Sequence, residues 1–205
     1  MDELNEREFF RVRLRFIDLI KSFFVAEPDS ELMSRWRGTF SALAKEQVSP
    51  GFDSAVNEIS RALNDKVLKE LQEEYYKLFV NPFDGSMMDT TASYYLNGRS
   101  YDQALVDIRG LMIEAGIQRG EGVTDPEDSL VVILDTFASL VEAEKAGGGE
   151  KVRQLQGRLL EGFLEPFADK FTAALKENEH ASFYYLCGRI LGAYIDLEKN
   201  LVVSM

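Results

Sequence analysis

The stretch Tyr75-Tyr76-Lys77-Leu78-Phe79-Val80-Asn81-Pro82 decides how the surrounding chain folds. Tyr75, Leu78 and Phe79 stand at positions i, i+3 and i+4, so they share one face of a helix. Pro82, three residues beyond Phe79, ends that helix because proline donates no backbone hydrogen bond. An aromatic and aliphatic cluster at a helix end is either ordinary core or one wall of a peptide groove. The spacing alone leaves both interpretations open.

Helical spacing continues on both sides of this stretch. Apolar residues recur at helical intervals over about residues 5–24, 30–43, 53–63, 64–79, 100–115, 125–146, 152–163 and 179–197. Residues suited to a helix start head four of these segments: Ser30, Asn64 or Asp65, Ser100 and Asp125. Runs that alternate as strands do are scarce. The sequence therefore predicts an all-α fold, a single globular domain over residues 1–205 with about eight to ten helices.

Four interruptions divide this helical pattern. The segment Asn81–Ala92 predicts a loop of about a dozen residues, longer than most connections in a compact domain. The segment Gly116–Thr124 contains three glycines, so we expect a flexible connector and a hinge there. Gly147-Gly148-Gly149 predicts a further break, and Pro166 interrupts or restarts the helix that precedes it.

The composition indicates a folded protein in a reducing compartment. Of the 205 residues 45% are hydrophobic, which is enough for a core and argues against disorder. A single cysteine, Cys187, excludes an internal disulfide. Residues 1–6 are acidic where a secretory signal is basic, and no apolar run approaches the roughly 20 residues of a membrane span. We therefore expect a cytoplasmic protein without a membrane span.

The chain is strongly acidic, with a net charge of −12. Phosphate groups would be repelled over much of such a surface, so nucleic acid is an unfavourable partner. The acids concentrate between Glu121 and Glu150, where eight acidic residues stand against one basic residue, Lys145. A cationic peptide would be attracted most strongly to this segment. Alternatively, the acidic net charge serves solubility alone.

Motifs for catalysis and metal binding are missing from the sequence. The only histidine is His180, and the spacing Glu177-x-x-His180 is half of a di-iron motif that needs a second histidine. Neither a nucleophile elbow nor a phosphate-binding loop is present. Cys187 lies in an apolar helical pattern and is expected to be a core residue. We expect no catalytic residue, metal or cofactor, and thus a protein that is not an enzyme.

Several segments resemble the TorD/DmsD/NarJ family, which are cytoplasmic chaperones for molybdenum-containing reductases. Glu74–Phe79 followed by Pro82 resembles the family's E-Y-x-x-L-F-x-x-P signature. Ala92–Tyr95 is similar to its small-Ser-x-aromatic segment, and Thr124–Leu130 to its E-P-x-D-H segment. In the last of these, aspartate replaces the glutamate at Asp125, and serine replaces the histidine of the motif.

Two later segments extend the resemblance toward the end of the chain. Phe163–Phe171 looks like a shortened form of the family's F-L-x-x-H-L-x-P-W-x-P-x-F segment, and Ala181–Tyr184 like its later F-Y stretch. The prolines and tryptophan that commonly precede the small-Ser segment are replaced by residues 89–91. Together the segments run in order from about Leu71 to Tyr194.

The resemblance implies an all-helical chaperone with two partners. It would bind the N-terminal twin-arginine signal peptide, and the apo-precursor, of a molybdopterin oxidoreductase of the dimethyl sulfoxide, trimethylamine oxide or nitrate reductase type. Binding would delay export until the molybdenum cofactor is inserted. The family also implies mainly a monomer, with a minor domain-swapped dimer formed across the hinge at residues 116–124.

By the same resemblance, ten residues would form the peptide-binding site: Tyr75, Leu78, Phe79, Pro82, Ser93, Tyr95, Asp125, Pro126, Asp128 and Ser129. The first three would line an apolar groove and Tyr95 would add an aromatic wall. Asp125 and Asp128 would face arginines, because aspartates form bidentate pairs with guanidinium groups. The run from Asp125 to Asp128 is also typical of a helix start, with a capping acid and an early proline, so both roles stay open.

Two other functions stay open at this stage. One is a helical enzyme acting on a nucleotide, such as a GTP hydrolase, since some relatives are reported to bind guanine nucleotides. The absent phosphate loop and the single histidine count against it. The other is an adaptor that binds a folded redox subunit without recognising a signal.

Overall fold

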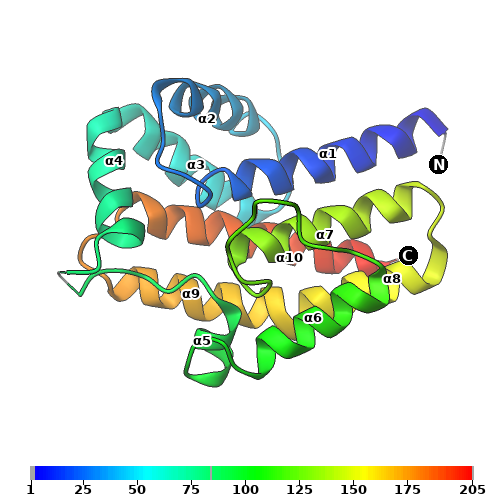
Figure 1. The fold of residues 1–205 in the computed structure, drawn as a ribbon. Coiled ribbons are helices and arrows are strands. Elements are labelled where there is room, and N and C mark those ends of the chain that lie inside the picture. The colour runs from blue at the N-terminus through cyan, green and yellow to red at the C-terminus, as the bar shows by residue number, and fades with distance from the viewer. Residues whose placement is uncertain (1–2, 84, 205) are drawn as a thin grey trace. The chain divides into compact units, whose positions relative to one another are not determined.

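In a computed structural model, which describes residues 3–83 and 85–204, the chain is almost entirely helical (Figure 1). The helices are α1 (Glu3–Lys21), α2 (Ser30–Leu43), α3 (Pro50–Asp65), α4 (Leu68–Tyr75), α5 (Ala92–Asn97), α6 (Gln103–Ala115), α7 (Leu130–Lys145), α8 (Gly149–Leu159), α9 (Glu165–Glu177) and α10 (Phe183–Ser204), with the π-helical segments η1 (Tyr76–Val80) and η2 (Leu160–Leu164). No strand forms within the described ranges, and an isolated bridge joins Thr91 to Ser129. The predicted all-α fold of about eight to ten helices is confirmed.

The helices gather into two compact units. Unit 1 comprises the residues up to Lys21, Thr90–Phe167 and the residues from Leu197 onward. Unit 2 comprises Ser22–Asp89 and Ala168–Asp196. Each unit therefore joins segments that are far apart in the sequence.

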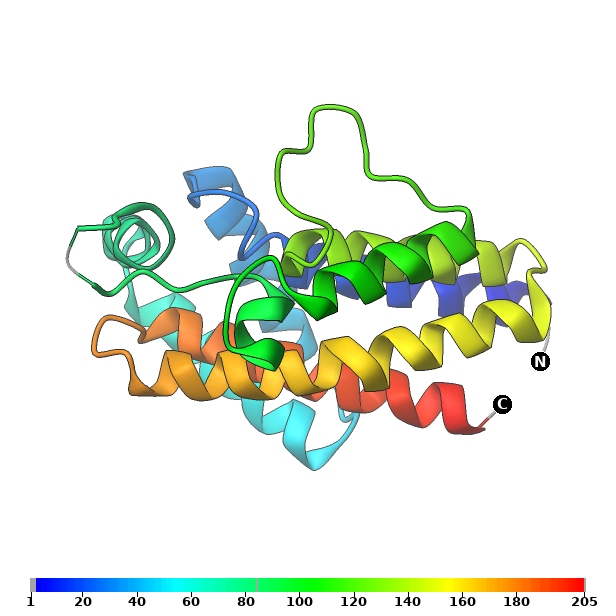
Figure 2. The same ribbon diagram turned by 60° about the horizontal axis from the view of Figure 1, so that its bottom comes forward.

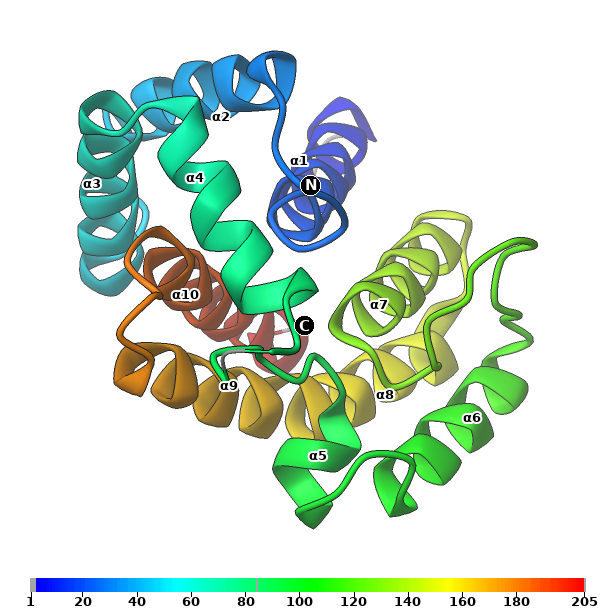
Figure 3. The same cartoon turned by 60° about the vertical axis from the view of Figure 1, so that its left-hand side comes forward.

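Unit 2 is built around the first part of α10. Figure 3 shows α2, α3, α4 and α9 around this helix. The side chains of Phe183, Tyr184 and Cys187 on α10 are fully buried. The Phe183 ring packs against the Trp36 indole of α2 at a centroid distance of 5.8 Å. Aromatic packing of this kind holds the helices of unit 2 together.

Unit 1 is built around α7. Helices α1 and α8 pack against α7, and α6 packs against α8. Figure 1 shows α1 and α7 side by side. Five apolar side chains of α7 are fully buried, namely Leu130, Ile133, Leu134, Phe137 and Val141. Their burial supplies most of the free energy that keeps this helix in place.

A buried ion network ties α1 to three other helices of unit 1. Arg13 donates to the carboxylate of Glu198 in α10, with Nη2 and Oε2 2.7 Å apart. The same guanidinium donates to Glu144 of α7 at 3.0 Å and to Gln156 of α8 at 2.8 Å. Glu144 also lies 3.5 Å from Arg153, whereas the Glu198 carboxylate is buried against Arg13, so the network disfavours any packing that separates α1 from α10.

The connection between α6 and α7 is a long loop within unit 1. Figure 2 shows residues 116–129 arching away from the two helices. Gly116 and Gly122 in this loop have φ angles of 70° and 81°, which glycine adopts without strain. The predicted connector is present, and the hinge stays a prediction.

Two helices near the start of the chain begin at residues other than those predicted. Asp29 caps α2, because its carboxylate accepts the Leu32 N–H at 2.7 Å, and Ser30 becomes the first helical residue. The helix that contains the opening stretch begins at Leu68, since Asp65 still belongs to α3. For α2 the predicted cap is one position away from the one used. The cap position of α4 is Val67, whose N–H donates to the Glu70 carboxylate at 2.9 Å.

The predicted starts of α6 and α7 are also wrong. Asp102, not Ser100, caps α6. Helix α7 begins at Leu130 and not at Asp125, with Ser129 as its cap. The Ser129 N–H bonds the carbonyl of Pro126 at 3.0 Å, so the residues before Ser129 form a turn instead of a first helical turn.

Candidate functional site

The end of α4 and the segment η1 hold the three predicted groove residues. Tyr75 and Leu78 are buried and Phe79 is half-buried. The Phe79 ring centroid lies 5.2 Å from that of Tyr75 and 5.1 Å from that of Tyr184. A third ring, that of Phe24, lies 6.1 Å away. These residues share one helical face as predicted, and that face belongs to the aromatic core of unit 2.

The other side of the same helix end exposes apolar side chains. Tyr76 and Val80, four residues apart, are each about half exposed, and Phe83 is 92% exposed. Pro82 between them is exposed as well. We call Tyr76, Val80 and Phe83 the η1 surface. Exposed apolar side chains this close in sequence offer surface for contact with another molecule.

The loop that follows η1 is tied back to it. The Ser86 hydroxyl donates to the carbonyl of Lys77 at 3.0 Å. The Met88 N–H donates to the carbonyl of Leu78 at 2.7 Å. Carbonyl groups that a helix end leaves without helical partners are thus satisfied. Ser86 and Met88 are therefore held in place against η1.

Glu74 caps the start of α10 within unit 2. Its buried carboxylate accepts the Tyr184 N–H at 2.8 Å and lies 3.5 Å from the Lys66 ammonium. Burial raises the pKa of the Glu74 carboxyl above its ordinary value, and the hydrogen bond from Tyr184 and the charge of Lys66 offset this only in part. Glu74 therefore joins α4 to α10 and has a structural role.

In unit 1, Asp128 is bound to the start of α5. Its carboxylate accepts the Ser93 N–H at 2.9 Å and also the Ser93 hydroxyl. Next to it, the Ala92 N–H donates to the Asp128 carbonyl at 2.8 Å, and the Leu130 N–H to the Thr90 carbonyl at 2.9 Å. Asp128 and Ser93 have no exposed surface. The predicted contact of Asp128 with an arginine would require this arrangement to open.

The other predicted residues of unit 1 lie in different settings. Asp125 is exposed and Pro126 is half-buried. Ser129 is buried and caps α7. Tyr95 is half-buried, with its ring 5.4 Å from that of Phe167. Asp125, Pro126 and Tyr95 thus keep surface for a ligand, whereas Ser129 does not.

Comparison with known protein families gives a match over more than half of the chain. Residues 45–173 match the nitrate reductase delta subunit family. The chain belongs to that family. It includes the NarJ- and TorD-like chaperones, so the resemblance found in the sequence is confirmed. Curated proteins yielded no match.

A solved structure shares the fold of this delta subunit family member. It is the crystal structure of a candidate redox enzyme maturation protein from Archaeoglobus fulgidus, with a TM-score of 0.56 and 18% sequence identity. The match covers 90% of this chain and 93% of the other. At this identity the likeness concerns the fold.

Membership in the nitrate reductase delta subunit family indicates a chaperone of redox enzyme maturation, whose partner is a redox enzyme subunit. It also implies a function without catalysis. Within the described ranges, no group of three or more histidine, cysteine, aspartate or glutamate residues is placed to hold a metal ion. In those same ranges, no helix has both the length and the apolar character to cross a membrane.

The acidic segment of this family member offers less exposed charge than its composition suggests. Half of the eight acids between Glu121 and Glu150 are engaged inside unit 1. They are Asp128, bound to Ser93, and Glu127, Asp135 and Glu144, which pair with Arg109, Lys21 and Arg13. The attraction that this segment exerts on a cationic peptide is therefore weaker than the sequence indicates.

The sequence interpretation missed Glu74 and the η1 surface, although both had a signal. Leu71, Glu74, Tyr75 and Leu78 lie on one helical face, so a carboxylate interrupts an otherwise apolar stripe. A buried carboxylate needs hydrogen-bond donors, which predicts a capping or pairing role. Helical spacing also places Tyr76 on the opposite side from that stripe. The family signature drew attention to the inward face alone.

Proposed function

We propose that this chaperone binds the twin-arginine signal peptide of a molybdenum-containing reductase in the cytoplasm and delays its export until the cofactor is inserted. The η1 surface supports the proposal. A twin-arginine signal joins a cationic end to an apolar run. Tyr76, Val80 and Phe83 offer that run an apolar contact on an ordered helix end.

The size of the exposed side chains suits a peptide of moderate affinity. Full burial of one large apolar side chain contributes about 1.5–3 kcal/mol. Two of the three side chains are already half-buried, so covering the η1 surface would contribute about twice that amount, from which the ordering of the peptide and of Phe83 subtracts. We expect a dissociation constant between nanomolar and micromolar.

A pocket beside Tyr76 offers the arginines of the signal an aromatic ring and carboxylates. This shallow pocket of about 350 Å³ in unit 2 is lined by Tyr76, by the acids Glu27 and Glu73, and by the bases Lys69 and Lys77. The Glu73 carboxylate lies 3.6 Å from the Lys69 ammonium, so part of its negative charge is already neutralised. Glu27 is exposed. A guanidinium can stack on the Tyr76 ring and pair with the Glu27 carboxylate.

Calorimetry with a synthetic twin-arginine signal peptide tests this proposal. Val80→Asp places a charge in the η1 surface and is expected to weaken binding about tenfold or more. Val48→Asp is the matched control, because Val48 is 52% exposed and Val80 is 49% exposed, both in unit 2. Equal affinity of the two variants would contradict the assignment of the η1 surface.

A second pair of variants locates the electrostatic part of the site. Glu27→Gln should weaken binding of the signal peptide. When the paired arginines of the peptide are replaced by alanine, this variant and the parent protein should bind the peptide with nearly equal affinity. Asp125→Asn is the comparison, since Asp125 is the exposed acid that the family resemblance favours. If only Asp125→Asn lowers the affinity for the signal peptide, the arginines bind in unit 1 and not at Glu27.

The assembly state is part of the same proposal. We propose that the chaperone is mainly a monomer, and that a minor dimer exchanges segments across residues 116–124. Light scattering after size exclusion should show a dominant monomer. A dimer that persists on dilution would contradict this.

A further inference from the structure

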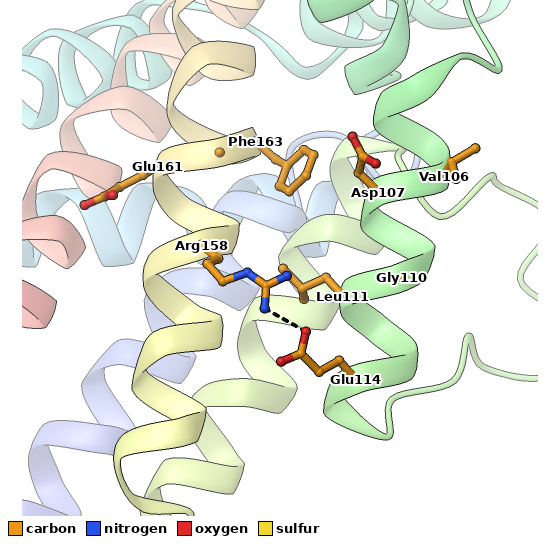
Figure 4. A pocket seen from close by; sticks show the side chains of 9 residues that line it. Val106, Asp107, Gly110, Leu111, Glu114, Arg158, Glu161 and Phe163 are labelled. Carbon is orange, nitrogen blue, oxygen red and sulfur yellow. Dashed lines mark hydrogen bonds and ion pairs between the residues drawn. The ribbon is translucent and has the colours of Figure 1, made fainter.

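A second groove lies in unit 1, between α6 and the helix end formed by α8 and η2. Its volume is about 780 Å³. Figure 4 shows the two helical walls, with the Phe163 ring pointing from η2 into the space between them. At one end the Arg158 guanidinium crosses the groove to the Glu114 carboxylate at 2.7 Å. The groove shares no residue with the η1 surface, which belongs to unit 2.

Apolar side chains form part of the groove lining and of its α6 rim. Leu111 lines it as a buried residue, and Phe163 as a half-buried one. Along the α6 rim, Val106 is 59% exposed and Ile113 is 80% exposed. These two are seven residues apart, so they stand two turns apart on one side of α6. An apolar strip of this length fits the side of another helix.

Two glycines leave room for a close approach. Gly110 on α6 and Gly162 in η2 both line the groove. A Cβ atom added at either position would meet no heavy atom within 4 Å. Alanine would therefore fit, and it would stabilise a helix by about 0.5–1 kcal/mol relative to glycine. Glycine therefore lowers helix stability at both walls of the groove, and at these positions the backbone of a partner could approach closely.

The charges of the lining favour a basic partner. Asp107, Glu114 and Glu161 line it against one basic residue, Arg158. In Figure 4 the Glu161 side chain extends from the side of the helix away from Phe163, so Asp107 and Glu114 supply the carboxylates between the two walls. The Arg158 charge is already paired with Glu114. Asp107 projects from α6 toward Phe163 in Figure 4. A cation on a partner would therefore meet the Asp107 carboxylate, which has no basic partner within the lining.

We propose that this groove binds a basic amphipathic helix of the redox enzyme subunit, outside its signal peptide. The apolar side of the helix packs on Phe163, Val106 and Ile113, and a lysine or arginine of the helix faces Asp107. Packing of a helix between two others is the usual helix-in-groove mode. The proposal rests on the chaperone family and goes beyond signal peptide binding, because it gives the subunit a second contact.

A synthetic helix of about four turns, made of leucine and lysine in amphipathic order, is the probe. A Cβ atom at Gly110 meets no heavy atom within 4 Å, so Gly110→Leu should extend into the groove, make the protein more stable and weaken probe binding about tenfold in fluorescence anisotropy. Gly38→Leu is the matched control, since Gly38 is an exposed glycine of α2 with equal space around its Cβ position. It should stabilise the protein and leave binding unchanged.

Three outcomes would overturn the proposal. The first is equal probe affinity of Gly110→Leu and the parent protein, and the second is equal affinity for a leucine and glutamate probe of the same pattern. The third is a dimer in sedimentation velocity that Gly110→Leu dissociates, because the groove would then bind a second copy of this chain. Binding of the twin-arginine peptide should be the same in Gly110→Leu and the parent, so failure here is distinct from failure at the η1 surface.

Discussion

The two π-helical segments share a local sequence pattern, but the chain beyond them takes different paths. Each has a phenylalanine three residues before a proline: Phe79 and Pro82 at η1, and Phe163 and Pro166 at η2. At η1 the chain leaves the helix and enters a loop, whereas at η2 it continues directly as α9. A proline at the same position therefore ends the helix at η1, whereas at η2 the chain remains helical.

The proline explains the π turn in both places. In a regular helix Pro82 would have to bond the Leu78 carbonyl and Pro166 the Gly162 carbonyl, which a residue without an N–H cannot do. Instead the residue before each proline donates its N–H five residues back, from Asn81 at η1 and from Glu165 at η2. The wider turn gives the proline ring the room that an α-turn denies it.

The residues after the proline decide whether the helix continues. After Pro166 come Phe167, Phe171 and Leu175, which are all fully buried at helical spacing. No such stripe comes after Pro82, and the Met88 N–H takes the Leu78 carbonyl instead. Burial of an apolar stripe thus outweighs the missing hydrogen bond at η2, and nothing compensates for it at η1.

The largest expected difference between the segments is in stability. Phe79→Ala removes a ring that touches three other aromatic rings, so the free energy of unfolding should fall by about 3 kcal/mol. Phe163→Ala removes a ring that faces an open groove and should lower it by less than about 1 kcal/mol. Chemical denaturation monitored by circular dichroism measures both, and equal losses would contradict the comparison.

Glu74→Ala should have the next largest effect. It removes the acceptor of the Tyr184 N–H at the start of α10 and leaves buried donors unpaired, so we expect a loss of about 2 kcal/mol. Glu161→Ala, in the exposed side of η2, is the control and should change stability by less than about 0.5 kcal/mol. A loss as large at Glu161 would show that the two segments do not differ in this respect.

The raised pKa of Glu74 gives a smaller, pH-dependent effect. Because the folded protein holds this proton more tightly than the unfolded chain does, the contribution of Glu74 is greatest below its ordinary pKa of 4.5 and declines as the pH rises through the raised value. Glu74→Gln keeps a carbonyl acceptor and cannot titrate. Its stability relative to the parent should therefore improve as the pH rises from 4.5 toward neutrality, and a constant difference would contradict the pKa shift.

The smallest expected effect separates the two prolines. Pro166→Ala restores an N–H inside a continuous helix and should raise the free energy of unfolding by about 0.5–1 kcal/mol. Pro82→Ala should change it little, because the Leu78 carbonyl already has the Met88 N–H as its donor. Denaturation midpoints of the two variants provide the test, and a gain at Pro82 as large as at Pro166 would contradict it.

The fold class could be predicted from periodicity, and the helix starts could not. The buried stripe of α7, from Leu130 to Val141, is regular enough to indicate a helix from the sequence alone. Its start was misplaced because Asp125 is as good a cap as Ser129 when only neighbours are considered. The hydrogen bond between Asp128 and Ser93, 35 residues apart, holds the preceding turn, and no local pattern reveals it.

The site was predicted in part for a similar reason. The shared face of Tyr75 and Phe79 follows from spacing, but whether that face is inward depends on Phe24 and Tyr184, which are distant in sequence. The acidic segment loses exposed charge to Arg13 and Lys21, more than 100 residues away. Local sequence therefore reports which residues belong together and says less about which of them reach the surface.

The most direct test of signal binding at η1 is nuclear magnetic resonance of the full chain during titration with a twin-arginine signal peptide. We expect the backbone amide shifts to concentrate at Tyr76, Val80 and the loop from Phe83 to Met88, with the amides of the Phe163 groove unchanged. Shifts confined to the groove between α6 and η2, or none at the η1 surface, would contradict the claim that the outward side of η1 binds the signal.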